Sequence, residues 1–121
     1  MNYQDVRARL ERSKGTTLRP VFDSNTEDFG LPADYELFLQ QVGAGKVGDA
    51  VFQFYDGVVF ADEVYGRPTA GCEKILIFGD DFQGTAFGFD RSDWSIVSIA
   101  PSQDIERVAD SFEQFVVERF P

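Results

Sequence analysis

Residues 75–90 read ILIFGDDFQGTAFGFD, and this stretch decides the fold. The run Ile75–Phe78 is apolar at every position, so a strand formed here is expected to be buried on both faces. The segment Gly79–Gly84 is acidic and bounded by glycines, and its length suits a hairpin turn. After it, Phe87 and Phe89 alternate with small or charged residues, which is typical of a strand with one buried face. The stretch therefore predicts the central hairpin of an antiparallel sheet.

Two helices are expected before this hairpin. Tyr3, Val6 and Leu10 recur at helical spacing, with Asn2 as the predicted N-cap. Loop signals follow over residues 13–30. A second helix is expected to begin at Pro32 and to end at Gly43. Its apolar stripe at i, i+3, i+4 and i+7 consists of Tyr35, Phe38, Leu39 and Val42.

Residues 43–48 match the motif G-x-G-x-x-G. That motif binds a dinucleotide only when a strand precedes it and a helix follows it, and here the predicted order is reversed. The glycines are therefore interpreted as a helix cap and a loop.

Further strands are predicted at Ala50–Tyr55, closed by a turn at Asp56–Gly57, and at Trp94–Ala100. The segment Val58–Tyr65 fits either a strand or a helix, and both remain open. A C-terminal helix is expected from residue 104 or from Ser111, where Gln114 completes a capping box. Its core-facing residues are predicted to be Val108, Phe112, Phe115, Val116 and Phe120. Helices at both ends of hairpin-linked strands predict one α+β domain over residues 1–121, with an antiparallel sheet of four to six strands.

The chain is strongly acidic, with 21 Asp and Glu against 11 Lys and Arg and a net charge of −10. The first 20 residues contain five bases and two acids, so the acidity belongs to the rest. An acidic body repels nucleic acid and anionic lipid and attracts basic proteins. Solubility alone would also explain this charge. We therefore expect no nucleic-acid partner, and the oligomeric state stays open.

The catalytic repertoire is small, because the chain has no His and only one Cys, Cys72. These absences exclude imidazole triads and leave no internal disulfide, so we expect no enzyme activity, no cofactor and no metal. Carboxylate-only catalysis or small-ligand binding remains an alternative. No apolar run approaches the length of a membrane span and the N-terminus is unlike a signal peptide, so we expect a cytoplasmic protein without a membrane partner.

Acidic and aromatic side chains near the predicted turns are the candidates for contact with a protein partner, because such pairs anchor interfaces. The predicted partner-binding residues are Asp49, Tyr55, Asp56, Asp80, Asp81 and Trp94. Two alternatives accompany this prediction. Asp80 and Asp81 are also explained as the polar residues of a hairpin turn, without a binding role. Trp94 is also explained as a side chain that covers the end of the sheet.

Three blocks of the sequence resemble the SUKH superfamily, which includes the yeast cell-wall-assembly regulators of the Smi/Knr type. The first, Leu31–Gly43, is similar to the family's LP-x-x-Y/F helix. The second, Ile77–Asp90, resembles its central hairpin, and the third, Ala109–Phe115, resembles its closing a-S-F-x-x-F helix. The resemblance implies an α+β fold that functions by binding proteins, with no shared catalytic set.

Bacterial members of this superfamily resemble immunity proteins that neutralise a cognate toxin, often a nuclease. The resemblance therefore implies an immunity protein for a toxin domain. The alternative is a regulatory or scaffolding domain for endogenous proteins.

Overall fold

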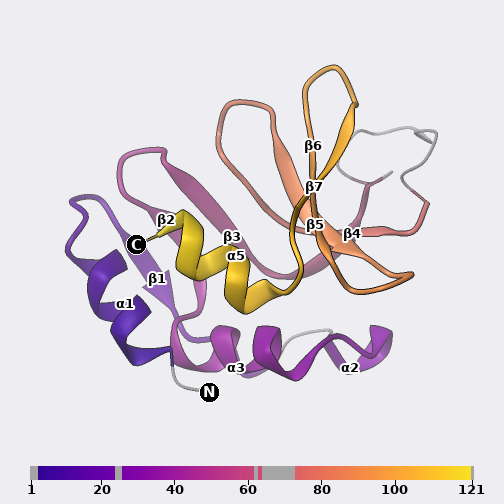
Figure 1. Ribbon diagram of the computed structural model, residues 1–121. Coiled ribbons are helices and arrows are strands. Elements are labelled where there is room, and N and C mark those ends of the chain that lie inside the picture. Colours follow the sequence, from indigo (N-terminus) through magenta and orange to yellow (C-terminus); the bar gives the residue numbers. More distant parts are fainter. Residues whose placement is uncertain (1–2, 24–25, 62, 64–72, 121) are drawn as a thin grey trace.

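The structure, a computed structural model, describes residues 3–23, 26–61, 63 and 73–120. Its strands form one antiparallel meander in which each strand pairs with the next along the chain (Figure 1). In order they are β1 (Thr17–Arg19), β2 (Ala44–Val47), β3 (Phe52–Phe60), β4 (Ile75–Asp80), β5 (Ala86–Asp90), β6 (Ile96–Ile99) and β7 (Ile105–Ala109). The helices are α1 (Gln4–Glu11), α2 (Thr26–Phe29), α3 (Ala33–Gln41) and α5 (Phe112–Arg119). The α+β class is confirmed, but the described residues form a sheet of seven strands, more than the predicted four to six.

The helices α1, α3 and α5 pack on one face of the sheet and enclose an aromatic core. Phe78 of β4 is fully buried there, with its ring 5.1 Å from Phe112 and 5.4 Å from Phe115 of α5. Tyr35 of α3 lies 5.2 Å from Phe89 of β5. Except for Val108, the predicted stripes of the helices are buried in this core, because each helix presents them to the sheet.

The prediction that β4 is buried on both faces is confirmed. Leu76 and Phe78 belong to the helix-side core, and Ile75 and Ile77 belong to a second buried cluster on the opposite face. The neighbouring β5 was expected to bury one face only, and this was wrong. Ala86 is 3% exposed and belongs to the second cluster, so β5 is covered on both faces as well.

Gly79 and Gly84 perform different tasks in the central hairpin. Gly84 lies in the turn and takes a positive φ, +93°. Gly79 lies in β4 itself, where a Cβ would meet the Gln53 carbonyl oxygen at 2.4 Å and the Phe52 ring at 2.8 Å. The strand β4 therefore depends on Gly79 for close approach to β3.

The extra strands lie where loops or helix were expected. The strand β1 falls within the predicted loop of residues 13–30, and β2 replaces the loop expected after Gly43. Both pair in register, with Leu18 opposite Gly45 and Gly45 opposite Phe54. At the C-terminus, β7 occupies residues predicted as helix, and Val108 is 38% exposed instead of buried.

The predicted turn at Asp56–Gly57 is wrong, because these residues lie inside β3. The register shifts there, since Phe54 pairs with Gly79 but Val59 pairs with Ile77, and β3 therefore carries a bulge. Residues 58–60 of the undecided segment are strand. Tyr65 and Cys72 lie outside the described residues.

The helix ends match the predictions at Gly43 and Ser111 and differ by one residue at the starts of α1 and α3. Tyr3 takes the N-cap position of α1 that was predicted for Asn2, which lies outside the described residues. Pro32 precedes the first residue of α3, and Gly43 follows its end with a φ of +109°. The Ser111 hydroxyl accepts the Gln114 N–H at 3.1 Å, so α5 begins at the predicted capping box and not at residue 104. None of the helices described is long and apolar enough to cross a membrane.

Two tyrosine hydroxyls are buried beneath the helices. Tyr3 and Tyr35 are each 1% exposed, and neither hydroxyl has a hydrogen-bond partner among the described residues. Burial raises the pKa of both side chains well above the usual value, because ionisation would place a charge in an apolar core. Asp56 adds to the rise in the pKa of Tyr35, and Asp34 to that of Tyr3.

The tyrosine burial predicts a steep loss of stability in alkali. Unfolding returns the pKa of both residues to about 10, so above that pH the unfolded chain binds fewer protons than the folded one. The free energy of unfolding should then fall by up to about 1.4 kcal/mol per pH unit for each tyrosine. Urea titrations at several pH values measure this slope. Replacement of Tyr35 by Phe should reduce it, and an unchanged slope would contradict the assignment.

The central ring predicts a large core effect. Phe78→Ala should lower the free energy of unfolding by about 3–5 kcal/mol, because it leaves a cavity among rings. Phe22→Ala is the matched control, since Phe22 is 78% exposed, and it should change stability by less than about 0.5 kcal/mol. Urea denaturation of both variants measures the free energy of unfolding. Similar decreases for the two variants would contradict the central position of Phe78 in the core.

Candidate functional site

Three of the turns in the meander lie at the same end of the sheet. They join β2 to β3 (residues 48–51), β4 to β5 (residues 81–85) and β6 to β7 (residues 100–104), and Figure 1 shows them along its upper side. A Cβ on Gly84 would lie 3.1 Å from the Pro101 side chain, so the second and third turns adjoin. We call these three turns, together with Asp80, the turn edge.

Each turn of this edge contains one residue other than glycine with a positive φ. These are Ala50 (60°), Phe82 (63°) and Gln103 (71°). The left-handed conformation costs such residues about 1 kcal/mol or more, so the surrounding turn must impose it. Apolar side chains are exposed in or beside each turn, with Val51 at 52%, Phe82 at 43% and Ile105 at 40%.

The β4–β5 turn is fixed by its two aspartates. Asp80 accepts the Phe82 N–H at 2.9 Å through Oδ1 and the Tyr55 hydroxyl at 2.6 Å through Oδ2. Asp81 Oδ1 accepts the N–H groups of Gln83 and Thr85 at 2.9 and 3.1 Å. These bonds hold Phe82 in its left-handed conformation with its side chain partly exposed.

The charge of the turn edge has one sign. Its acids are Asp49, Asp80, Asp81 and Asp104, and the three turns contain no Lys or Arg. Such a surface attracts cationic groups of a partner. The described part of the chain has no group of three or more His, Cys, Asp or Glu side chains arranged to hold a metal ion.

The structure brings together four of the six predicted contact residues. Asp49, Asp80 and Asp81 lie on the turn edge, and the hydroxyl of Tyr55 reaches Asp80. Asp56 is exposed at the bulge in the middle of β3, away from the turns. Trp94 lies in the β5–β6 turn at the opposite end of the sheet, half-buried against Phe89 at a ring distance of 6.0 Å.

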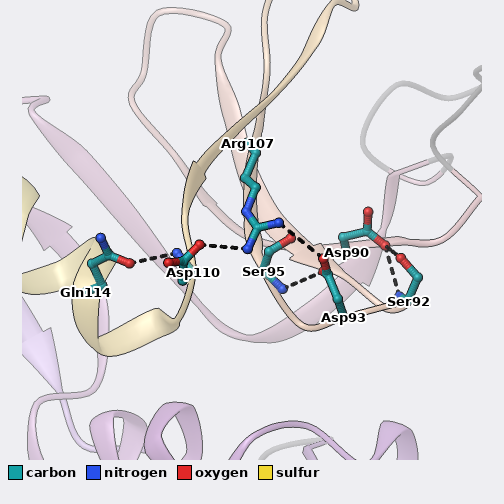
Figure 2. A network of polar contacts seen from close by, with 7 residues as sticks. All are labelled: Asp90, Ser92, Asp93, Ser95, Arg107, Asp110 and Gln114. Atoms are coloured by element: carbon teal, nitrogen blue, oxygen red, sulfur yellow. Dashed lines mark hydrogen bonds and ion pairs between the residues drawn. The ribbon is translucent and has the colours of Figure 1, made fainter.

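The surroundings of Trp94 form a separate polar network (Figure 2). Arg107 of β7 donates to Asp93 at 3.5 Å and to Asp110 at 2.6 Å, so it joins the β5–β6 turn to the start of α5. The Ser95 N–H donates to Asp93 at 2.9 Å. Hydrogen bonds from the hydroxyl and the N–H of Ser95 hold the pKa of Asp93 below its usual value, and the Arg107 charge adds to this effect.

The predicted set of contact residues left out Phe82, the aromatic residue of the turn edge. The sequence around Phe82, two aspartates before it and Gln-Gly after it, predicts a turn, and an aromatic residue in a turn is expected to be exposed. Val51, Asp104 and Ile105 were missed because β7 was predicted as helix and Val51 as strand.

The fold defines the class of protein: an α+β domain with helices on one face of an antiparallel meander and acidic, aromatic-bearing turns at one end. A family model described as SUKH_6, SMI1-KNR4 cell-wall, matches residues 27–116. The chain belongs to this family, as the three sequence blocks indicated. No match to a curated protein or to a solved structure was found.

The pKa of Asp93 predicts an acid-sensitive contact. A carboxyl whose pKa falls on folding stabilises the protein above its unfolded value of about 3.8, and this contribution disappears as the pH falls through the lower folded value. Asp93→Asn should therefore reduce stability at neutral pH and have a smaller effect in strong acid. Ser95→Ala should raise the pKa of Asp93 in an NMR titration, and an unchanged pKa would exclude the Ser95 hydroxyl as its cause.

Proposed function

We propose that the protein is a protein-binding module, and that it acts as an immunity protein that binds and blocks a cognate toxin domain in the cytoplasm. Membership of the SUKH family and its implied protein-binding role support this proposal. The turn edge is the proposed contact surface. The proposal includes no catalytic step, no cofactor and no metal.

Phe82 is the observation that carries the proposal. It holds a large apolar side chain 43% exposed, in a conformation that costs stability, on a turn braced by two aspartates. A side chain fixed in advance loses little entropy on binding, and buried aromatic anchors dominate interface energies. Strain retained on an exposed aromatic favours a binding role, since the fold gains little from it.

The acids around Phe82 point to a basic partner. A nuclease or other nucleic-acid-directed toxin carries Lys and Arg to bind phosphate, and the carboxylates of the turn edge would compete for the same groups. Charge of opposite sign also speeds the encounter. The acidic remainder of the chain strengthens this attraction.

A regulatory domain for endogenous proteins is the second candidate, favoured by the SMI1-KNR4 cell-wall description of the family. Affinity capture of the tagged protein from its source cells, read by mass spectrometry, separates the two. One stoichiometric partner with a toxin-like domain supports the immunity role. Several endogenous partners and no toxin would support the regulatory role instead.

Replacement of Phe82 by Gly should separate binding from stability. Glycine adopts a positive φ without strain, so we expect unfolding free energy to stay equal or to rise by up to about 1 kcal/mol. Affinity for the captured partner should fall by about ten-fold or more, because the anchor is lost. Isothermal titration calorimetry and urea denaturation measure both quantities. Phe22→Ala is the control and should leave affinity unchanged, and full affinity of Phe82→Gly would exclude the turn edge.

A further inference from the structure

The meander has two edges, and they differ in length and surroundings. The strand β1 forms one edge with only three residues and lies within the first 20 residues, which carry more bases than acids. The strand β7 forms the other edge with five residues, of which Ile105–Val108 are all exposed. Short edge strands resist further pairing, whereas a longer exposed edge offers its backbone groups to another strand.

The pairing pattern shows which backbone groups of β7 face outward. The Ala100 N–H donates to the Asp104 carbonyl at 2.9 Å, so this pair is hydrogen-bonded across the β6–β7 hairpin. Hydrogen-bonded and non-bonded pairs alternate in an antiparallel ladder, so Ser98 and Glu106 form the next bonded pair. The N–H and C=O groups of Ile105 and Arg107 therefore point away from β6.

Side chains on both faces of β7 give an added strand apolar contact. Ile105 is 40% exposed on the face of the second cluster, where it pairs with Ile99. Val108 is 38% exposed on the helix face and lines a groove of about 200 Å³ with Phe87 and Phe115. The cross-strand neighbours of an added strand would bury these side chains.

The charge around this edge selects the occupant. Residues 104–119 contain five acids and two bases. Arg107 is engaged by Asp93 and Asp110 of its own chain (Figure 2). Arg119 lies over the Phe87 ring at 4.8 Å. Glu106 and Glu118 flank the helix face of the edge and its groove. A second copy of the chain carries a net charge of −10 and would repel the first, whereas a basic segment is attracted.

We infer that β7 is a docking edge that binds an extended, Lys- or Arg-bearing segment of a partner protein as an eighth strand. The backbone groups of Ile105 and Arg107 pair with the segment, its apolar side chains cover Ile105, and its basic side chains reach Glu106 and Glu118. This inference rests on the proposed protein-binding function and names how the partner is held. Ile105 also borders the turn edge, so the two surfaces are continuous.

The test uses the full chain and synthetic peptides, and it needs no natural partner. The probe is a seven-residue peptide of alternating Lys and Val with blocked ends. Its two controls are the same peptide N-methylated on alternate backbone amides, and a peptide with Glu in place of Lys. Peptide titrations are followed through the backbone amide resonances in ¹⁵N NMR spectra.

The Lys/Val peptide should shift the amide resonances of residues 105–108 and slow the hydrogen exchange of Ile105 and Arg107. The N-methylated and Glu peptides should bind at least about ten-fold more weakly, because one lacks the ladder donors and the other the charge. Equal binding of the N-methylated peptide would overturn the inference, as would shifts confined to other residues or no binding. If the amides of Ile105 and Arg107 are already protected from exchange before peptide is added, the edge is occupied in the free protein and the inference is wrong. A dimer whose population rises with protein concentration would then identify a second copy of the chain as the occupant.

Replacement of Ile105 by Pro tests the same edge from the side of the protein. Proline removes an N–H that points outward and is tolerated at the first residue of an edge strand. Ile105→Ala, which keeps the N–H, is the matched control, and circular dichroism confirms folding of both. Peptide affinity should fall more for Ile105→Pro than for Ile105→Ala, and equal losses would contradict ladder pairing. If the peptide does not bind β7 but Phe82→Gly still weakens partner binding, the docking edge is wrong and the proposed function stands. If the peptide binds β7 and Phe82→Gly leaves partner affinity unchanged, only the turn edge is excluded as a contact surface.

Discussion

The burial of β4 on both faces is the constraint on which the rest of the structure depends. Phe78 and Leu76 can leave water only if helices cover one face, and Ile75 and Ile77 require a second cluster on the other. Because β4 is the middle strand of seven, its burial also fixes the register of β3 and β5. The turn that holds Asp81 and Phe82 follows this strand directly, so a strand that is buried on both faces positions the candidate site.

The central fold was predictable because its signals were apolar and local. The β4–β5 hairpin, the stripes of α1 and α3 and the cap at Ser111 all followed from spacing. The edge strands could not be predicted in this way. The strands β1 and β7 are short and exposed at most positions, so their sequences lack the alternation of apolar and polar residues that indicates a strand. Val108 stands four residues before Phe112 and matched a helical stripe, which produced the wrong helix over 105–109. Asp56–Gly57 has the composition of a turn and was predicted as one. A bulge inside a long strand needs the same backbone freedom, so the same residues occur there.

The site was only partly predictable, for a different reason. Acids at the hairpin ends could be found by composition, and the meander then placed Asp49, Asp80 and Asp81 at one end of the sheet. Trp94 and Asp56 were chosen for the same reason, as an aromatic and an acidic residue near predicted turns. The direction of the strands places Trp94 at the opposite end of the sheet and Asp56 in the middle of β3. Which turns share an end depends on the number of strands between them. The missed strands β2 and β7 are the ones that build two of the three turns.

The turn edge and the β7 edge together show how stability is distributed in this chain. Each of the three turns of the turn edge holds a residue other than glycine at positive φ, at a cost of about 1 kcal/mol or more. Like charges at the same end add repulsion, and an exposed strand edge forgoes a ladder of hydrogen bonds. None of these features helps the isolated domain to fold, and all lie outside the ring cluster around Phe78. A core that is packed on both faces of β4 offsets these costs, so the end that carries them can be shaped by the requirements of a partner.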